Sequence, residues 1–163
     1  MLIYDPFLSP IEISNVKSHG LLKNTGRDLQ FLLNRSTNPF INITGGPLSY
    51  RYEMFEIKVH FGIEDKLGSE HQVANKSFPI EIQVYGFNSE IYKNYSQAKH
   101  SPYGLIAVSI LTMLDTLRTL TRGDGTGNPP LMENNFRPIM PTNGRFIRTN
   151  IKVNQVTDMN GQD

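Results

Sequence analysis

Two side chains suited to site chemistry, Lys58 and His60, lie two residues apart in a stretch where apolar and polar residues alternate. Alternation of this kind places both on one face of a β-strand. Glu81 and Gln83 have the same spacing in a second such stretch and are expected to face them across a sheet. A His-x-His pair with a third histidine on the neighbouring strand is a standard catalytic zinc site, because three imidazoles then converge on one cleft. Only one of these positions is histidine, so the residues favour a polar cleft with a hydrogen-bonded His60.

Strands are the elements predicted to position these side chains. In residues 52–61, one face of the predicted strand consists of Phe55, Ile57, Val59 and Phe61. The opposite face consists of Glu56, Lys58 and His60. In residues 80–87, one face consists of Ile80, Ile82 and Val84, and the other of Glu81, Gln83, Tyr85 and Phe87. The polar faces of the two strands therefore form the candidate cleft.

Further strand patterns predict a mainly β fold. Residues 105–113 are apolar almost throughout, which is typical of a strand covered on both faces. Weaker strand patterns occur at 40–44 and 146–153, and turn signals occur at 45–47 and 75–76.

The sequence changes character after residue 113. Leu114, Leu117 and Leu120 have helical spacing for about two turns. The glycines and prolines of residues 122–130 then predict a flexible loop. We therefore expect a short helix or loop over 114–133, and a flexible tail over 153–163, which is rich in Asn, Gln and Asp.

The composition excludes several classes of protein. The chain has 163 residues, enough for one domain. Sixteen Lys and Arg against fifteen Asp and Glu give a net charge of +1, so a nucleic-acid partner is not expected. No apolar run approaches the roughly 18 residues of a membrane span, so membrane insertion is not expected. Cysteine is absent, which excludes disulfides, thiolate zinc ligands and cysteine nucleophiles.

Four N-x-S/T triplets provide candidate N-glycosylation sites at Asn34, Asn42, Asn75 and Asn94. This is a mild excess over the roughly two expected by chance. The N-terminus lacks the basic start and apolar stretch of a signal peptide. The triplets leave two interpretations open, a secreted chain and accidental triplets in a cytosolic one.

Short motifs in a fixed order carry a family resemblance. They occupy residues 4–10, 24–27, 45–48, 59–62, 68–71, 81–84, 104–105, 135–138 and 148–150. Together they resemble the α-class carbonic anhydrase domain, most closely the acatalytic carbonic anhydrase-related proteins of the ten/eleven subgroup. The similarity runs from residue 2 to 113 and again from 134 to 152. It implies a twisted, mostly antiparallel sheet.

The resemblance assigns the family's three zinc-ligand positions to Lys58, His60 and Gln83. Lys58 is an ammonium at neutral pH and has no lone pair to give. Gln83 offers an amide oxygen, which is a poor zinc donor beside imidazole. One imidazole out of three cannot hold zinc usefully, so we expect no zinc cofactor and no catalytic residue.

Other positions of the former active-site cleft agree with this. The family's proton-shuttling histidine corresponds to Arg27, which stays protonated near neutral pH. The family's acidic position is retained as Glu70, and Tyr85 also belongs to the cleft. Glu70 is expected to pair with Lys58. The expected metal-free polar network consists of Lys58, His60, Glu70 and Gln83.

The resemblance also implies a domain organisation and a function. Residues 1–152 are expected to form a partial domain, in which 114–133 is an unmatched insert replacing core strands. That loss is expected to leave apolar strand faces and sheet edges uncovered. The implied function is a catalytically inactive, secreted glycoprotein that binds a neurexin-type neuronal cell-surface receptor. The alternatives are a truncated isoform or gene-model product without independent function and, least expected, a zinc-dependent carbonic anhydrase.

Overall fold

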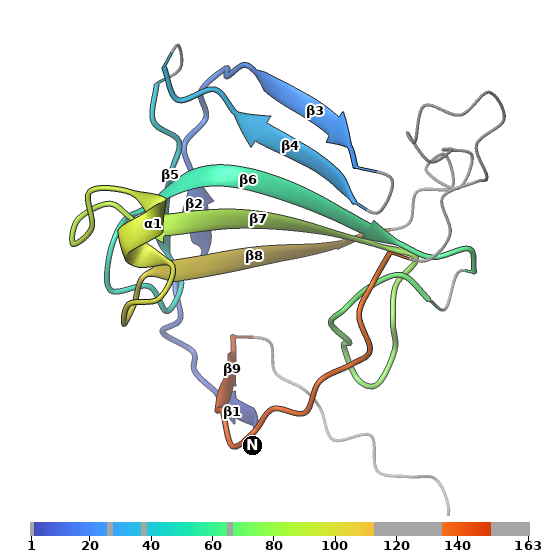
Figure 1. The fold of residues 1–163 in the computed structure, drawn as a ribbon. Coiled ribbons are helices and arrows are strands. Elements are labelled where there is room, and N and C mark those ends of the chain that lie inside the picture. Colours follow the sequence, from blue (N-terminus) through green and yellow to red (C-terminus); the bar gives the residue numbers. More distant parts are fainter. Residues whose placement is uncertain (1, 26–27, 37–38, 65–66, 113–134, 151–163) are drawn as a thin grey trace, which may run out of the picture.

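The computed structural model describes residues 2–25, 28–36, 39–64, 67–112 and 135–150. These residues form a mainly β structure with one short helix (Figure 1). The strands are β1 (Leu2–Tyr4), β2 (Ile11–Ile13), β3 (Gly20–Asn24), β4 (Leu29–Leu33), β5 (Asn42–Gly45), β6 (Tyr52–Phe61), β7 (Ile80–Asn88), β8 (Leu105–Thr112) and β9 (Ile147–Thr149). The helix is α1 (Tyr95–Ala98). The predicted fold class is confirmed.

Seven strands form one twisted antiparallel sheet built around β6 (Figure 1). One edge of β6 pairs with β5 near its start and with β4 towards its end, and the other edge pairs with β7. β2 extends the sheet beyond β5, β3 extends it beyond β4, and β8 extends it beyond β7. β1 and β9 form a separate parallel pair. The long β6 and β7 are thus the centre of the sheet.

The register of β6 against β7 brings the candidate residues together as predicted. Lys58 lies opposite Gln83, and His60 lies opposite Glu81. Directly opposed residues of an antiparallel pair point to the same side of the sheet. The polar faces of the two strands therefore form one continuous surface.

A β-bulge corrects one predicted side-chain direction. The register of β6 shifts between Met54 and Glu56, and a bulge of this kind inserts one extra residue into a strand. Phe55 was expected beside Ile57 on the apolar face, and this was wrong. Its ring instead contacts the rings of Tyr85 and Phe87. The alternation restarts after the bulge, so Lys58 and His60 keep their predicted face.

The apolar face of the sheet carries two small clusters. The larger one consists of the buried residues Ile41, Ile43, Tyr52, Met54 and Val84. The second consists of Phe61 and Ile80, with the partly buried Val59 and Ile82 packed against them. Both clusters use the β6 and β7 residues that alternate with the polar face.

The strand predicted over 105–113 is present as β8, but it is not covered on both faces. Among the described residues β8 pairs only with β7, and Leu105 and Ile110 are 39% and 46% exposed. A continuous apolar run predicts a strand without showing whether a second layer covers it. Ile106 and Val108 of β8 pack against the larger core cluster, whereas Leu105 and Ile110 stay partly exposed.

The weaker strand at 40–44 appears as β5, and β9 lies within the one predicted at 146–153, of which residues 151–153 lie outside the described part of the chain. The predicted turn at 75–76 is present, with positive φ at Ala74 and Asn75. β1 to β4 and α1 were not predicted. The expected helix or loop at 114–133 and the tail at 153–163 lie outside the described residues. The part of the chain that the structure describes contains no helix long and apolar enough for a membrane span.

Candidate functional site

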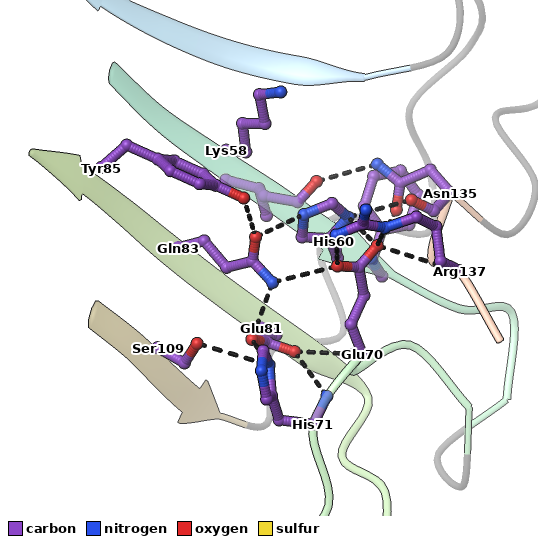
Figure 2. A network of polar contacts seen from close by, with 12 residues as sticks. Lys58, His60, Glu70, His71, Glu81, Gln83, Tyr85, Ser109, Asn135 and Arg137 are labelled. Carbon is purple, nitrogen blue, oxygen red and sulfur yellow. Dashed lines mark hydrogen bonds and ion pairs between the residues drawn. The ribbon is translucent and has the colours of Figure 1, made fainter. Parts of the chain in front are cut away.

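His60 is the centre of a buried polar network on the β6–β7 face (Figure 2). Its side chain is 8% exposed. Nδ1 lies 3.0 Å from the backbone oxygen of Asn135, and Nε2 lies 3.2 Å from Oε1 of Gln83. Asn135 is fixed beside β6, because its side chain accepts a hydrogen bond from the Phe61 amide and donates one to the Val59 carbonyl. The ring is therefore held from both sides.

Two carboxylates fix the orientation of the Gln83 amide. Its Nε2 donates to Glu81 Oε1 at 2.9 Å and to Glu70 Oε2 at 3.2 Å. Its Oε1 consequently points to His60 and also accepts a hydrogen bond from the Tyr85 hydroxyl. Burial, followed by the charge of Glu70, raises the pKa of Tyr85, which keeps this hydroxyl protonated as a donor.

Both ring nitrogens of His60 face oxygen atoms. The Asn135 carbonyl oxygen and the Gln83 amide oxygen can only accept hydrogen bonds. Each ring nitrogen of His60 thus has an oxygen neighbour, and a metal ion would have to displace one of them.

Glu81 anchors the loop that follows β6. Its side chain is fully buried. Oε2 accepts hydrogen bonds from the backbone amides of Glu70 and His71, and Oε1 accepts one from Nδ1 of His71 at 2.6 Å. Burial acts to raise the pKa of Glu81, but hydrogen bonds from Ser109, Gln83 and His71 outweigh it and lower the pKa. The carboxylate thus stays ionised inside the network.

Gly68 lets this loop approach β7 closely. Its φ is +147°, and a Cβ at this position would overlap the Pro79 carbonyl. The close approach allows the Ser69 amide to donate to the Phe78 carbonyl at 2.8 Å, and the Phe78 amide to donate to Ser69 Oγ at 2.9 Å. Glu70 follows directly and is thereby directed at Gln83.

The cation that pairs with Glu70 is Arg137. Its Nε lies 2.9 Å from Oε1 and its Nη2 lies 2.8 Å from Oε2, a bidentate arrangement. The Arg137 amide also donates to Oε1 at 3.0 Å. Burial acts to raise the pKa of Glu70, but the Arg137 hydrogen bonds and the charge of His60 outweigh it and lower the pKa to about 2.

The expected pairing of Glu70 with Lys58 was therefore wrong. Lys58 Nζ lies 3.9 Å from Glu56 Oε2 and 5.5 Å from the centre of the Tyr85 ring. The long, flexible side chain turns toward the partly exposed Glu56 on its own strand. The network of His60, Glu70 and Gln83 forms as predicted, with Arg137 in the place expected for Lys58.

The other candidate positions are distributed over the surface. Arg27 lies outside the described residues. Asn34, Asn75 and Asn94 are exposed, whereas Asn42 is half-buried in β5. Asn135 and Arg137 were not predicted as site residues, although both belong to the 135–138 motif that carried the family resemblance.

Glu70 is expected to make the fold sensitive to acid. Its folded pKa of about 2 lies below the ordinary value of 4.5. The ionised carboxylate therefore stabilises the folded chain fully above roughly pH 5, and this contribution is lost as the pH falls toward 2. Because solvent screens the exposed Arg137, we expect the ionised Glu70 to contribute only about 2 kcal/mol to the free energy of unfolding.

Urea unfolding from roughly pH 6 down to pH 3 measures this contribution in the wild type and in Glu70→Gln. The difference in unfolding free energy should shrink as the pH falls. The exposed Glu12→Gln is the matched control and should follow the wild type. Equal pH slopes for the wild type and Glu70→Gln would contradict the prediction.

Comparison with known proteins decides the family. The sequence profile described as eukaryotic-type carbonic anhydrase matches residues 1–116. The chain belongs to this family. A Caenorhabditis elegans relative, named as a carbonic anhydrase-like protein, is 46% identical over 117 residues. That match covers 68% of this chain and 34% of the relative, so the chain spans about a third of the relative's length. Placement in the ten/eleven subgroup stays a prediction.

The carbonic anhydrase family implies a zinc ion, and the residues present do not fit one. The three ligand positions offer an ammonium, one imidazole whose nitrogens both face acceptors, and an amide oxygen that already accepts two hydrogen bonds. Within the described ranges, no three histidine, aspartate or glutamate side chains are placed to hold a metal ion.

Proposed function

We propose that this carbonic anhydrase-related chain is catalytically inactive and acts as a secreted protein-binding module. The observation that carries the proposal is the donor set at the zinc-ligand positions. Lys58 puts an ammonium, which has no lone pair, at one zinc-ligand position, and Gln83 is held by the two carboxylates of Glu70 and Glu81. A catalytic zinc needs three neutral or anionic donors and one open position.

The hydrogen bonds of the network support this proposal, because both carboxylates are already satisfied without a metal ion. Glu70 pairs with Arg137 and accepts a hydrogen bond from Gln83. Glu81 accepts hydrogen bonds from Gln83, from His71 and from the Glu70 amide. A metal ion bound to either carboxylate would have to displace buried hydrogen bonds, which is costly.

The binding role follows from the family resemblance and from the N-x-S/T triplets. Three of the four candidate asparagines, Asn34, Asn75 and Asn94, are exposed and accessible to a glycan. The proposed partner is a neurexin-type cell-surface receptor, and the proposed location is extracellular. The alternative is a truncated product without independent function, and the partly exposed apolar residues Leu105 and Ile110 of β8 favour it.

Two measurements on one preparation test the proposal. Stopped-flow assays with added zinc should show no hydration of carbon dioxide above a protein-free blank. The immobilised chain should retain a neurexin ectodomain, whereas the heat-unfolded chain should not. Zinc-dependent turnover would refute inactivity, and no capture of the ectodomain would support the alternative.

A further inference from the structure

A groove beside the polar network is lined by two distant segments of the chain. It has a volume of about 640 Å³ and lies between residues 70–75 and residues 137–147. Glu70, His71 and Arg137 contribute to its wall, but Lys58, His60 and Gln83 do not. The groove is therefore separate from the former zinc positions.

A tight turn places a second arginine at this groove. The Arg145 amide donates to the Thr142 carbonyl at 3.0 Å, and Asn143 and Gly144 both have positive φ. This pattern is the hairpin-type turn that Asn-Gly favours. Nε of Arg145 donates to the same carbonyl at 2.9 Å. The side chain is thereby oriented, and among the described residues no carboxylate lies within ion-pair distance of the guanidinium.

The charge that the groove presents to a ligand is positive. Its acidic lining residue is Glu70, whose side chain is only 6% exposed and whose two oxygens are held by Arg137 and Gln83. Arg145 is exposed, and the side chain of His71 is 63% exposed. A carboxylate entering the groove would therefore meet Arg145 without competition from an exposed acidic group of the lining.

The same segment adds exposed apolar side chains. Met140 and Phe146 are 70% and 68% exposed, and Ile139 and Ile147 are 46% and 49% exposed. All four line the groove. Methionine and aromatic residues are enriched where proteins bind partners, because they bury a large area on contact.

We propose that this groove binds an extended, acidic peptide segment of the partner protein, in which carboxylates alternate with apolar side chains. The carboxylates pair with Arg145, and the apolar side chains pack on Met140 and Phe146. The inference rests on the proposed protein-binding function and names the surface and the partner chemistry. The charge of the groove and its apolar lining together favour this occupant.

The test uses the full chain and a fluorescein-labelled peptide of alternating Asp and Leu, followed by fluorescence anisotropy. Arg145→Glu should weaken binding by about tenfold, because it replaces attraction by repulsion. Lys17→Glu makes the same charge change at an exposed residue outside the groove lining and should leave the affinity unchanged. A peptide with Asn in place of Asp should bind more weakly, and added salt should weaken the Asp peptide. Far-UV circular dichroism of each variant establishes that it is folded.

Equal affinity of the wild type and Arg145→Glu for the Asp peptide would overturn the proposal. So would equal binding of the Asp and Asn peptides, or no saturable binding by the wild type. The ectodomain pull-down is run in parallel. If the wild type captures the ectodomain but does not bind the peptide, only the proposed peptide site in the groove is refuted. If the wild type does not capture the ectodomain, the proposed protein-binding function fails.

Discussion

Replacing Lys58 and Gln83 together by histidine is expected to convert the polar network into a zinc site. The two residues are register partners on β6 and β7, and His60 lies on the same face. The Gln83→His change removes the amide oxygen that faces Nε2 of His60, so that nitrogen becomes accessible to a metal ion. The Lys58→His change removes the opposing charge. Three imidazoles then meet the donor requirement for zinc.

The support for such a site is already present. The Asn135 carbonyl accepts from Nδ1 of His60, which leaves Nε2 as the metal-binding nitrogen. Glu81 contacts the side chain at position 83 and can orient an imidazole there. Loss of a hydrogen-bond partner that orients a metal ligand lowers metal affinity by roughly 10–100-fold. We expect the two added histidine ligands to raise the affinity for zinc by a larger factor than this.

Elemental analysis after desalting measures the gain. The double variant should retain about one zinc per chain and unfold at a higher temperature when zinc is added, because a ligand of the folded state stabilises it. The wild type and each single variant should retain substoichiometric zinc. A third change, His60→Asn, should abolish retention. One zinc per chain in the wild type would contradict both this prediction and the proposed inactivity.

Replacement of Glu81 by leucine is expected to destabilise the fold by about 3–5 kcal/mol. Glu81 accepts from the amides of Glu70 and His71, from the His71 ring and from Gln83. Leucine would leave these donors without an acceptor beside a buried site. Because several hydrogen bonds are lost at once, the cost exceeds that of one hydrogen bond.

Urea unfolding compares Glu81→Leu with two other variants. Glu81→Gln keeps an oxygen acceptor and should lose about half as much stability. Glu12→Leu makes the same chemical change at an exposed strand position and should stay within about 0.5 kcal/mol of the wild type. If Glu81→Leu leaves too little folded protein to measure, amide hydrogen exchange of residues 69–71 in Glu81→Gln provides the comparison. Wild-type stability in Glu81→Leu would refute the anchoring role.

Alternation along β6 and β7 was enough to predict the two central strands and the face on which His60 and Gln83 lie. It failed at Phe55, because one inserted residue reverses the side-chain direction and leaves no signal in the apolar pattern. The apolar pattern also did not predict that Leu105 and Ile110 of β8 would stay partly exposed. The sequence of an apolar strand is the same whether or not a second layer of structure covers it.

The candidate site was predicted in part for a similar reason. Residues that share a strand, or face one another on neighbouring strands, were found from spacing. Arg137 and Asn135 reach the site from 67 and 75 residues away, so spacing contains no information about them. Lys58 was chosen as the partner of Glu70 because it is a cation on the strand face expected to form the cleft and would balance the carboxylate charge. Arg137 makes this contact instead, because its planar guanidinium can donate hydrogen bonds to both carboxylate oxygens at once.

The distance between these partners has a consequence for synthesis on the ribosome. His60, Glu70 and Gln83 emerge well before Asn135 and Arg137, and chains grow by about 5–20 residues per second. For several seconds the nascent chain therefore carries a carboxylate without its arginine and a histidine held on one side only. In this interval the sheet lacks these two partners, and a pause in translation before residue 135 would lengthen the interval. Synthesis rate, as well as sequence, would then affect how much of this chain reaches its folded state.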